Sequence, residues 1–364
     1  MTGSPARGVA SVFDPTRLRL ARQAAMLSKK DLAALVDVTP SAISQYENGT
    51  VKPSAKVTAA LALALGMPVS FLAGGRDLGT APTVMAHFRS LRSASQRERD
   101  RAFAHALLTW ELTRVIQQTV RLPSVDLPGE LTIRSDEPTG AAEEVARRAR
   151  QHFGLEAGPV PNVVRLLEAH GIVCTRLPTQ TRRVFAFSCA FPERPVVVLA
   201  AERTHRATSR FAAAHECGHL VMHPDEEPGS QPVERQANAF AAEFLTPGSE
   251  IADVLPRRAD WQRLLELKSI WGVSIQALLF RARTLGVMPE HVYRRSVTEL
   301  NARGWRAKEP GDDGTAEEPV LLARALSLAE QRGVTIEDVA EAARLPIEMA
   351  RAIASVDERP AVKL

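Results

Sequence analysis

The stretch Phe211-Ala-Ala-Ala-His-Glu-Cys-Gly-His-Leu-Val-Met222 holds the pattern H-E-x-x-H within an apolar run. Residues four apart lie on one face of a helix, so His215 and His219 can bind one metal ion. Glu216 follows the first histidine, where it can act as general base on a water at that ion. Two ordinary surface histidines would give the same letters, but the apolar context favours a built site. The pattern therefore predicts a zinc hydrolase.

A catalytic zinc ion takes three protein ligands and keeps one position for water. Asp225 lies six residues after His219, the spacing of the H-E-x-x-H-x-x-G-x-x-H class, but Met222 stands where that class has glycine. Glu234 opens an amphipathic segment with the small Ala237 one turn later. This segment can lie against the metal helix, so Glu234 is favoured over Asp225 as third ligand. Two imidazoles and a carboxylate accept Zn²⁺ or Mn²⁺.

Several polar residues surround these motifs. His223 continues the helical face of His219, one turn too far to share the ion, and we expect it beside the site. Gln236 and Asn238 either orient the ligands or are surface residues, and we expect Glu243 in solvent.

Two further features concern a peptide substrate. No side chain stands out as a stabiliser of an oxyanion, and His205 and Tyr293 are weak candidates. The strand expected at 196–200 is a candidate for pairing with an extended substrate.

The composition indicates a largely helical protein of two or three domains. Of its 364 residues 45% are apolar and 5% aromatic, and the net charge is +4. Residues 1–75 hold eight Lys/Arg against four Asp/Glu, a balance that fits contact with phosphates. The longest apolar run, 57–72, is too short to span a bilayer. Three scattered cysteines fit a reducing compartment, and we expect a cytoplasmic protein without membrane contact.

Residues 28–49 read S-K-K-D-L-A-A-L-V-D-V-T-P-S-A-I-S-Q-Y-E-N-G, which predicts two short helices joined by a tight turn. Ala33 faces inward on the first helix and is small enough for a close crossing. Asp37 lies at the turn, where aspartate tolerates a left-handed backbone better than most residues. Thr39 caps the second helix, and Pro40 takes its first position, where a missing N–H costs nothing.

The second helix of this motif carries side chains suited to DNA. Short hydroxyls and an amide at its start can reach base edges in a major groove, and flanking residues can hold phosphates. A small protein-interaction module is the alternative. The expected DNA-binding residues are Lys29, Thr39, Pro40, Ser41, Ser44, Gln45 and Asn48.

Caps, breakers and charged stretches divide the chain into parts. Residues 15–72 predict five short helices. A long helix is expected to carry one apolar stripe, formed by Phe103, Leu107 and Trp110. This stripe either packs on the next domain or forms a dimer interface, and packing on the next domain is favoured. The charged, Gly-rich stretch 304–319 predicts a linker. The parts expected are a helix-turn-helix domain at 10–75, a connecting helix at 84–122, a metal-binding domain at 140–300 and a helical region at 318–357.

The metal-binding part reads as α+β, so the whole chain is expected to be multidomain and mainly α with an α+β part. Helices are expected at 141–154, 160–170 and 233–245, with the metal helix capped by Thr208 or Ser209. Strands are expected at 171–177, 184–190 and 195–200, the last of them a β-branched run.

The tail contains a weaker pattern of the helix-turn-helix kind. It runs from Val334 to Ile353, and Pro346 opens the second helix. Lys and Arg are few there, so we expect this region to pack against the rest of the chain.

Residues 15–72 resemble the Cro/phage-repressor (XRE) helix-turn-helix family. The pattern that carries the resemblance is Leu32-Ala33, Val38, Ile43-Ser44, Glu47 and Gly49. Asp37 stands at the turn, where the family often has glycine. The resemblance implies a five-helix repressor-like bundle, a recognition helix that begins at Pro40, and binding to a double-stranded DNA operator as a homodimer.

The metal-site segments are similar to those of the ImmA/IrrE family of zinc-dependent peptidases. They read Ala214-His-Glu-Cys-Gly-His219 and Glu234-x-x-Ala-Asn-x-Phe-Ala-Ala-Glu-Phe-Leu-x-Pro247. The resemblance implies a small gluzincin-like fold, with Zn²⁺ on His215, His219 and Glu234, and cleavage of a repressor, an antitoxin or a phage regulator. Gln236 stands where many members carry a second acidic residue.

Three functions fit the combination. We favour a bacterial transcription regulator with a zinc-dependent endopeptidase domain that cleaves itself or a partner regulator. The second is a pure transcription regulator whose metal domain senses a ligand or holds structure. The third is a protease that uses its DNA-binding part for localisation. Glu216 favours retained chemistry, because a sensor does not need a general base.

Overall fold

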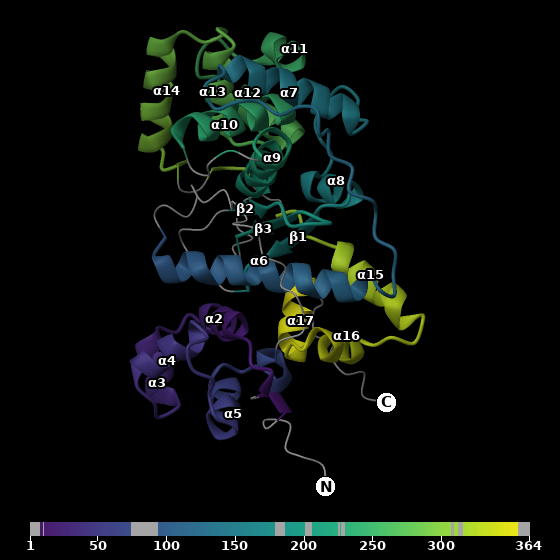
Figure 1. The fold of residues 1–364 in the computed structure, drawn as a ribbon. Coiled ribbons are helices and arrows are strands. Elements are labelled where there is room, and N and C mark those ends of the chain that lie inside the picture. Colours follow the sequence, from purple (N-terminus) through teal and green to yellow (C-terminus); the bar gives the residue numbers. More distant parts are fainter. Residues whose placement is uncertain are drawn as a thin grey trace, which may run out of the picture.

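A long helix, α6 (Gln96–Ile116), lies between the N-terminal helices and the small sheet (Figure 1). The computed structural model describes residues 8–9, 11–73, 94–178, 186–200, 206–224, 226, 230–306, 309–311 and 316–355. Within them the fold is mainly helical with one three-stranded sheet, which confirms the predicted fold class. Among the helices of these residues, none combines the length and apolar character needed to cross a membrane.

The N-terminal bundle consists of the five helices predicted for it, the last a short 3-10 helix. Ser28 and Asp31 form a reciprocal capping box that fixes where the first helix of the motif begins. Asp37 adopts the expected left-handed backbone, with φ of 54°, and Thr39 caps the second helix by accepting from the backbone N–H of Ala42. The elements are α2 (Pro15–Ala24), α3 (Lys29–Leu35), α4 (Pro40–Glu47), α5 (Ala55–Ala64) and η1 (Val69–Leu72).

The small sheet is buried on both faces. Its strands are β1 (Val173–Arg176), β2 (Ala186–Cys189) and β3 (Val196–Leu199), in the order β1-β3-β2 with β1 parallel and β2 antiparallel to β3. Alternate residues point to opposite faces: Val196 and Val198 pack in the core shared with α6, whereas Val197 and Leu199 pack in the core formed with the helices on the other side of the sheet. Burial on both faces explains why β3 is continuously apolar rather than alternating.

The position of β3 corrects one expectation. It is the central strand and pairs on both sides, with β1 and with β2. Its backbone groups are therefore committed to the sheet, and the strand is not available to an extended substrate. The apolar run predicted burial correctly but could not tell which strand would be central.

Helices cover the sheet on the side away from the N-terminal bundle (Figure 1). The metal helix begins at Arg206, earlier than the cap predicted at Thr208 or Ser209, and ends at Met222 just before Pro224. The elements are α7 (Thr139–His152), α8 (Val163–Ala169), α9 (Arg206–Met222), α10 (Gln231–Leu245), α11 (Gly248–Ile251), η3 (Ala252–Val254), α12 (Trp261–Trp271), α13 (Ile275–Thr284) and α14 (Glu290–Ala302).

The stretch predicted as a linker is anchored at its described ends. Glu309 accepts from Lys268 and from the backbone N–H of Ile275 at the start of α13. Glu317 is buried, forms an ion pair with Arg210 of α9 and accepts from the backbone N–H groups at the start of α8. Glu309 and Glu317, two of the charges that suggested a linker, therefore cap helices and form ion pairs.

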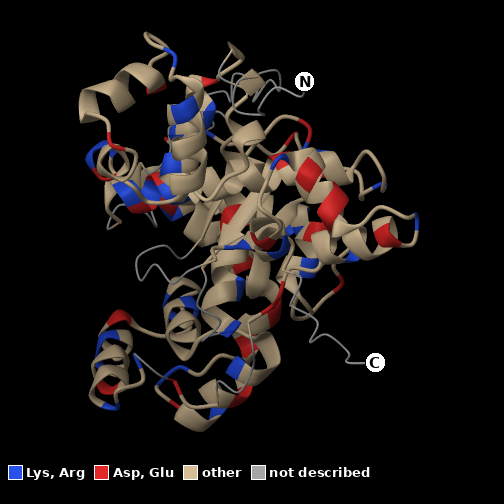
Figure 2. Cartoon of the chain, turned by 90° about the horizontal axis from the view of Figure 1, so that it is seen from below, with Lys and Arg blue, Asp and Glu red and all other residues tan. Residues whose placement is uncertain are grey.

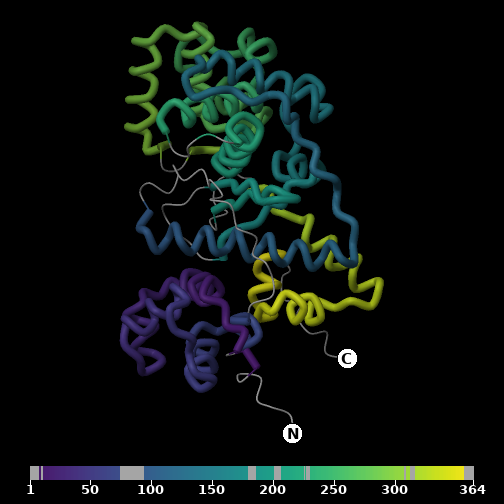
Figure 3. Tube along the Cα trace, in the orientation of Figure 1, coloured from purple at the N-terminus to yellow at the C-terminus, as the bar shows by residue number. Residues whose placement is uncertain are grey.

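The C-terminal helices are α15 (Leu321–Glu330), α16 (Ile336–Ala343) and α17 (Ile347–Ala354). α15 lies near one end of α6, and α16 and α17 lie on the same side of α6 as the N-terminal bundle (Figure 3). Ala350, Ile353 and Ala354 of α17 are buried, and the carbonyl of Ile353 accepts from Thr175 of β1 at 3.1 Å. This confirms the packing role expected for the tail.

The pair α16–α17 repeats the local geometry of α3–α4. Thr335 and Asp338 form the same kind of capping box as Ser28 and Asp31. At the turn, Arg344 has φ of 58°, against 54° for Asp37. The backbone bond that closes each turn is also equivalent: Leu345 N–H to Ala340 C=O, and Val38 N–H to Ala33 C=O.

The long helix packs as the sequence predicts. Leu107 and Trp110 are buried, and the Trp110 ring stacks on Phe191 next to the sheet, with centroids 5.3 Å apart. The stripe of α6 is therefore an intramolecular contact in this structure.

Candidate metal centre and nucleic-acid interface

The candidate metal site depends on a close crossing of α9 and α10. Gly218 faces the Phe240 ring, and a Cβ atom at Gly218 would lie 2.9 Å from that ring. Ala237 is fully buried on the facing side. Small residues at this crossing let α10 approach α9 closely enough for Glu234 to face the two histidines.

The three predicted ligands converge. The Nε2 atoms of His215 and His219 are 3.0 Å apart, and the Glu234 carboxylate lies 3.3 Å from the first and 3.8 Å from the second. One ligand atom from each residue lies within 4.8 Å of the others. Two imidazole nitrogens and a carboxylate, with His219 and Glu234 buried, fit a divalent zinc-like ion chemically.

Glu216 lies next to this cluster and is held by the sheet. It is 3% exposed, and its carboxylate accepts from the Ser188 hydroxyl at 2.7 Å. Burial raises the pKa of Glu216 to about 7, opposed by the His215 charge and the Ser188 hydrogen bond. A carboxyl group with this pKa can both accept and return a proton near neutral pH.

The cluster opens into a cavity of about 630 Å³. His215, Glu216 and Glu234 line one part of it. The rest is mostly apolar and is contributed by α9, α10, α13 and α14; its larger side chains are Phe211, Leu245, Val273, Phe280 and Tyr293. The cavity can therefore receive an apolar group beside the cluster.

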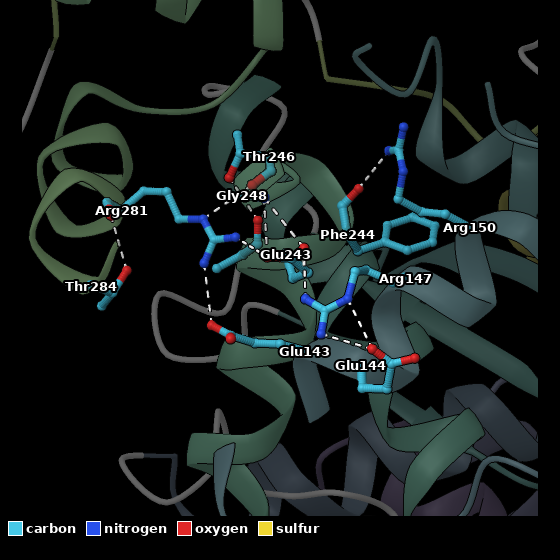
Figure 4. Close-up of polar contacts among 11 residues, drawn as sticks. Glu143, Glu144, Arg147, Arg150, Glu243, Phe244, Thr246, Gly248, Arg281 and Thr284 are labelled. Carbon is cyan, nitrogen blue, oxygen red and sulfur yellow. Dashed lines mark hydrogen bonds and ion pairs between the residues drawn. The ribbon is translucent and has the colours of Figure 1, made fainter. Parts of the chain in front are cut away.

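Glu243 corrects an expectation, because it is not in solvent. It is 2% exposed and forms ion pairs with Arg281, which also lines the cavity, and with Arg147 of α7 (Figure 4). Arg281 bonds in addition to Glu143 and to the Thr246 carbonyl. This network joins the end of α10 to α7 and α13 at one wall of the cavity.

The remaining candidate residues around the site differ in their positions. Asp225 and His205 lie outside the described residues. Tyr293 lines the cavity. His223 is fully buried, and its Nδ1 lies 3.3 Å from Nδ1 of His219. Asn238 is exposed on α10, and its Oδ1 contacts Nδ1 of His215 at 3.1 Å, where it can orient that ring.

Most of the predicted DNA-binding residues are exposed on one edge of the N-terminal bundle. Thr39, Pro40, Ser41, Gln45 and Asn48 are all exposed on or next to α4. These residues therefore lie on the surface at the two ends of the expected recognition helix and along it, where they can be reached by DNA.

Lys29 and Ser44 differ from this set. The Lys29 ammonium donates to the Ser44 hydroxyl at 3.1 Å and lies 3.7 Å from the buried Glu47 carboxylate. Both side chains are only partly exposed. They therefore help to join α3 to α4, and their contact with DNA stays a prediction.

Two arginines that sequence reasoning missed complete this edge. Arg22 pairs with Glu47 at 2.5 Å, and Arg19 donates to the Glu47 carbonyl at 3.0 Å and to the Asn48 side chain at 3.4 Å. Arg19 is half exposed and can also face a phosphate. The sequence carried no signal for it, because the contact joins α2 to the end of α4. Basic and acidic residues are otherwise interspersed along the chain (Figure 2).

Comparison with known families identifies two segments of the chain. A helix-turn-helix family model matches residues 18–72, and a peptidase family model described as the IrrE N-terminal-like domain matches residues 167–283. No curated protein showed significant similarity to the chain. The protein is thus a regulator-type fusion, in which a helix-turn-helix DNA-binding domain is joined to an IrrE-like peptidase-family domain.

Proposed function

We propose that the protein is a transcription regulator whose IrrE-like domain is a zinc-dependent endopeptidase that cleaves the protein itself or a partner regulator. The observation that carries this proposal is the convergence of His215, His219 and Glu234 beside the buried Glu216. A purely structural metal site does not need a further carboxyl group next to its ligands.

His215, His219 and Glu234 would hold Zn²⁺, with Mn²⁺ as the alternative. When bound, the ion supplies Lewis acidity and lowers the pKa of a water molecule. Glu216 accepts a proton from water and returns it to the leaving amine. Ser188 keeps the Glu216 carboxylate oriented through its hydrogen bond. Tyr293, in the cavity wall, is the candidate donor to the developing oxyanion.

The substrate proposed is a protein segment with a bulky apolar side chain next to the cleaved bond. The cavity beside the cluster is mostly apolar and large enough for such a side chain. Repressors, antitoxins and phage regulators are the partner class that we favour, because the peptidase domain is fused to a DNA reader.

The DNA part is proposed to bind a double-stranded operator as a homodimer in the bacterial cytoplasm. Ser41 and Gln45 would read base edges, and the flanking residues would hold phosphates. Replacing Ser41 and Gln45 with alanine should abolish the preference for one operator among duplexes selected from a random pool. Unchanged selectivity in a gel-shift competition would remove this assignment.

A second candidate function is supported by the apolar character of the cavity. A regulator that senses a ligand there would need the cavity but not Glu216. The same features also serve a protease, so the two functions differ in whether Glu216 is essential to the biological output.

The deciding experiment is peptide cleavage. Full-length protein loaded with zinc or manganese is incubated with a peptide library prepared from a bacterial proteome, and new termini are identified by mass spectrometry. We expect cleavage next to apolar residues by the wild type and by the control Glu299→Gln, and none by Glu216→Gln. If the protein binds metal but no variant cleaves any peptide, the endopeptidase proposal is wrong and the sensor is favoured.

A further inference from the structure

A buried chain of hydrogen bonds leads from His219 to a turn before α7. Nδ1 of His219 lies 3.3 Å from Nδ1 of His223, and Nε2 of His223 lies 3.0 Å from Oε1 of Gln236. Nε2 of Gln236 donates to the carbonyls of Arg134 and Glu137 at 2.8 and 2.9 Å. The three linked side chains are at most 1% exposed, so each of these polar atoms must be satisfied inside the protein.

The two carbonyls determine the direction of every bond in this chain. A backbone carbonyl can only accept, so the NH₂ group of Gln236 must face the turn and its oxygen must face His223. That oxygen can only accept, so Nε2 of His223 carries a hydrogen. In the neutral imidazole Nδ1 is then an acceptor, and it accepts from Nδ1–H of His219. His219 is left with its lone pair on Nε2, the atom that faces His215 and Glu234.

We propose that His223 and Gln236 are positioning residues, which hold His219 in the one tautomer able to bind a metal through Nε2. The inference rests on the metal site proposed above. Hydrogen-bond partners of this kind fix the ring orientation and tautomer of ligating histidines. Here the partner is a His–Gln pair, and the far end of that pair is bonded to the backbone of the turn at 134–137.

The chain of bonds also ties the ion to the segment before α7. The backbone N–H of Ile133 donates to the carbonyl of Met222, the last residue of α9, at 3.1 Å. The turn at 134–137 therefore lies across the end of the metal helix. A displacement of this turn would release Gln236, let the His223 ring rotate and weaken the hold on His219.

The test compares zinc affinity and histidine tautomers in the full-length protein. Zinc binding is measured by competition with a chromophoric chelator. His223→Phe fills the space without an acceptor, His223→Gln keeps one, and His152→Phe is the control outside the site. We expect His223→Phe to weaken zinc binding about 10- to 100-fold, His223→Gln to recover most of the loss, and His152→Phe to change nothing.

Imidazole nitrogen NMR of the metal-free, histidine-labelled wild type reads the tautomers directly and does not depend on how a variant folds. We expect His219 protonated at Nδ1 and His223 at Nε2. The opposite tautomer at His219, or full zinc affinity in His223→Phe, would overturn the positioning role. If the wild type binds no zinc while the tautomers are as expected, the metal site is wrong and the hydrogen-bond chain stands.

Discussion

The DNA-binding bundle is joined to α6 by a buried ion pair whose removal should be costly. Arg17 and Glu111 are 2% and 5% exposed, and two hydrogen bonds of 2.7 and 2.5 Å connect the guanidinium to the carboxylate. Glu111→Gln keeps the shape of the side chain and leaves the buried Arg17 charge without its counter-ion. Breaking such a pair from one side typically costs about 3–5 kcal/mol, and we expect about 3 kcal/mol here.

The same interface provides a matched control. Arg97 of α6 lies 3.6 Å from Asp31 of α3, with the two side chains 59% and 47% exposed. Exposed pairs contribute about 0–1 kcal/mol because water and salt screen them. Arg97→Gln should therefore change the free energy of unfolding by less than about 1 kcal/mol, although it removes an ion pair between the same bundle and the same helix.

The assay is denaturant unfolding of the full-length protein, with hydrogen exchange to follow α2 and α6 separately. Glu111→Gln should speed exchange in both helices, and Arg97→Gln should not. The double variant Arg17→Met/Glu111→Leu removes both charges and should recover much of the stability. If Glu111→Gln costs no more than Arg97→Gln, apolar packing alone holds the bundle to α6 and the reasoning fails.

Three further predictions follow from single residues. Burial lowers the pKa of His105 to about 4, from about 6.5 in an unfolded chain. Between these two pH values the unfolded state binds more protons than the folded state. The free energy of unfolding should therefore fall by about 2 kcal/mol from pH 7 to pH 5. His105→Gln should flatten this pH dependence in thermal unfolding, and an unchanged slope would contradict the assignment. Gly218→Ala brings a Cβ atom to 2.9 Å from the Phe240 ring, so it should lower the free energy of unfolding by about 1–3 kcal/mol and weaken zinc binding. The control is Ala212→Gly, at the cavity edge of the same helix. In zinc titrations of both variants, this control should bind zinc as the wild type does. Ala277→Trp should fill the cavity and block peptide cleavage at unchanged zinc content, whereas cleavage at the wild-type rate would place the substrate elsewhere.

The parts of the protein that could be predicted from its sequence are those determined by local pattern. The spacing of His215 and His219 needs only a helix, and Asp37, Thr39 and Pro40 define a turn within a few residues. Glu234 required one more step, because its segment had to cross the metal helix closely. The small Ala237 made that crossing plausible, and the structure adds Gly218 on the opposing helix.

What could not be predicted depends on partners far away in the chain. Glu243 was expected in solvent, because no neighbouring residue in the sequence indicates its partner. That partner is Arg281, which forms an ion pair with Glu243 inside the protein. The central position of β3 depends on pairing with strands on both sides. The Arg17–Glu111 pair likewise joins residues that are 94 positions apart in the chain. Each of these contacts could have formed with many other residues of suitable chemistry, so only the folded structure identifies the partner.

The helix pairs α3–α4 and α16–α17 share a backbone geometry but expose different side chains. Capping box, left-handed turn residue and closing backbone bond are the same in α3–α4 and α16–α17, so the pattern of letters predicts geometry in both. The outward faces differ: α4 exposes Ser41 and Gln45, whereas α17 exposes the acidic Glu348 and buries Ile353 against β1 and α6. An acidic side chain is repelled by phosphates, and a helix packed on the core cannot enter a major groove. We therefore expect DNA to contact the exposed face of α4, whereas α16–α17 pack the C-terminal region against the core.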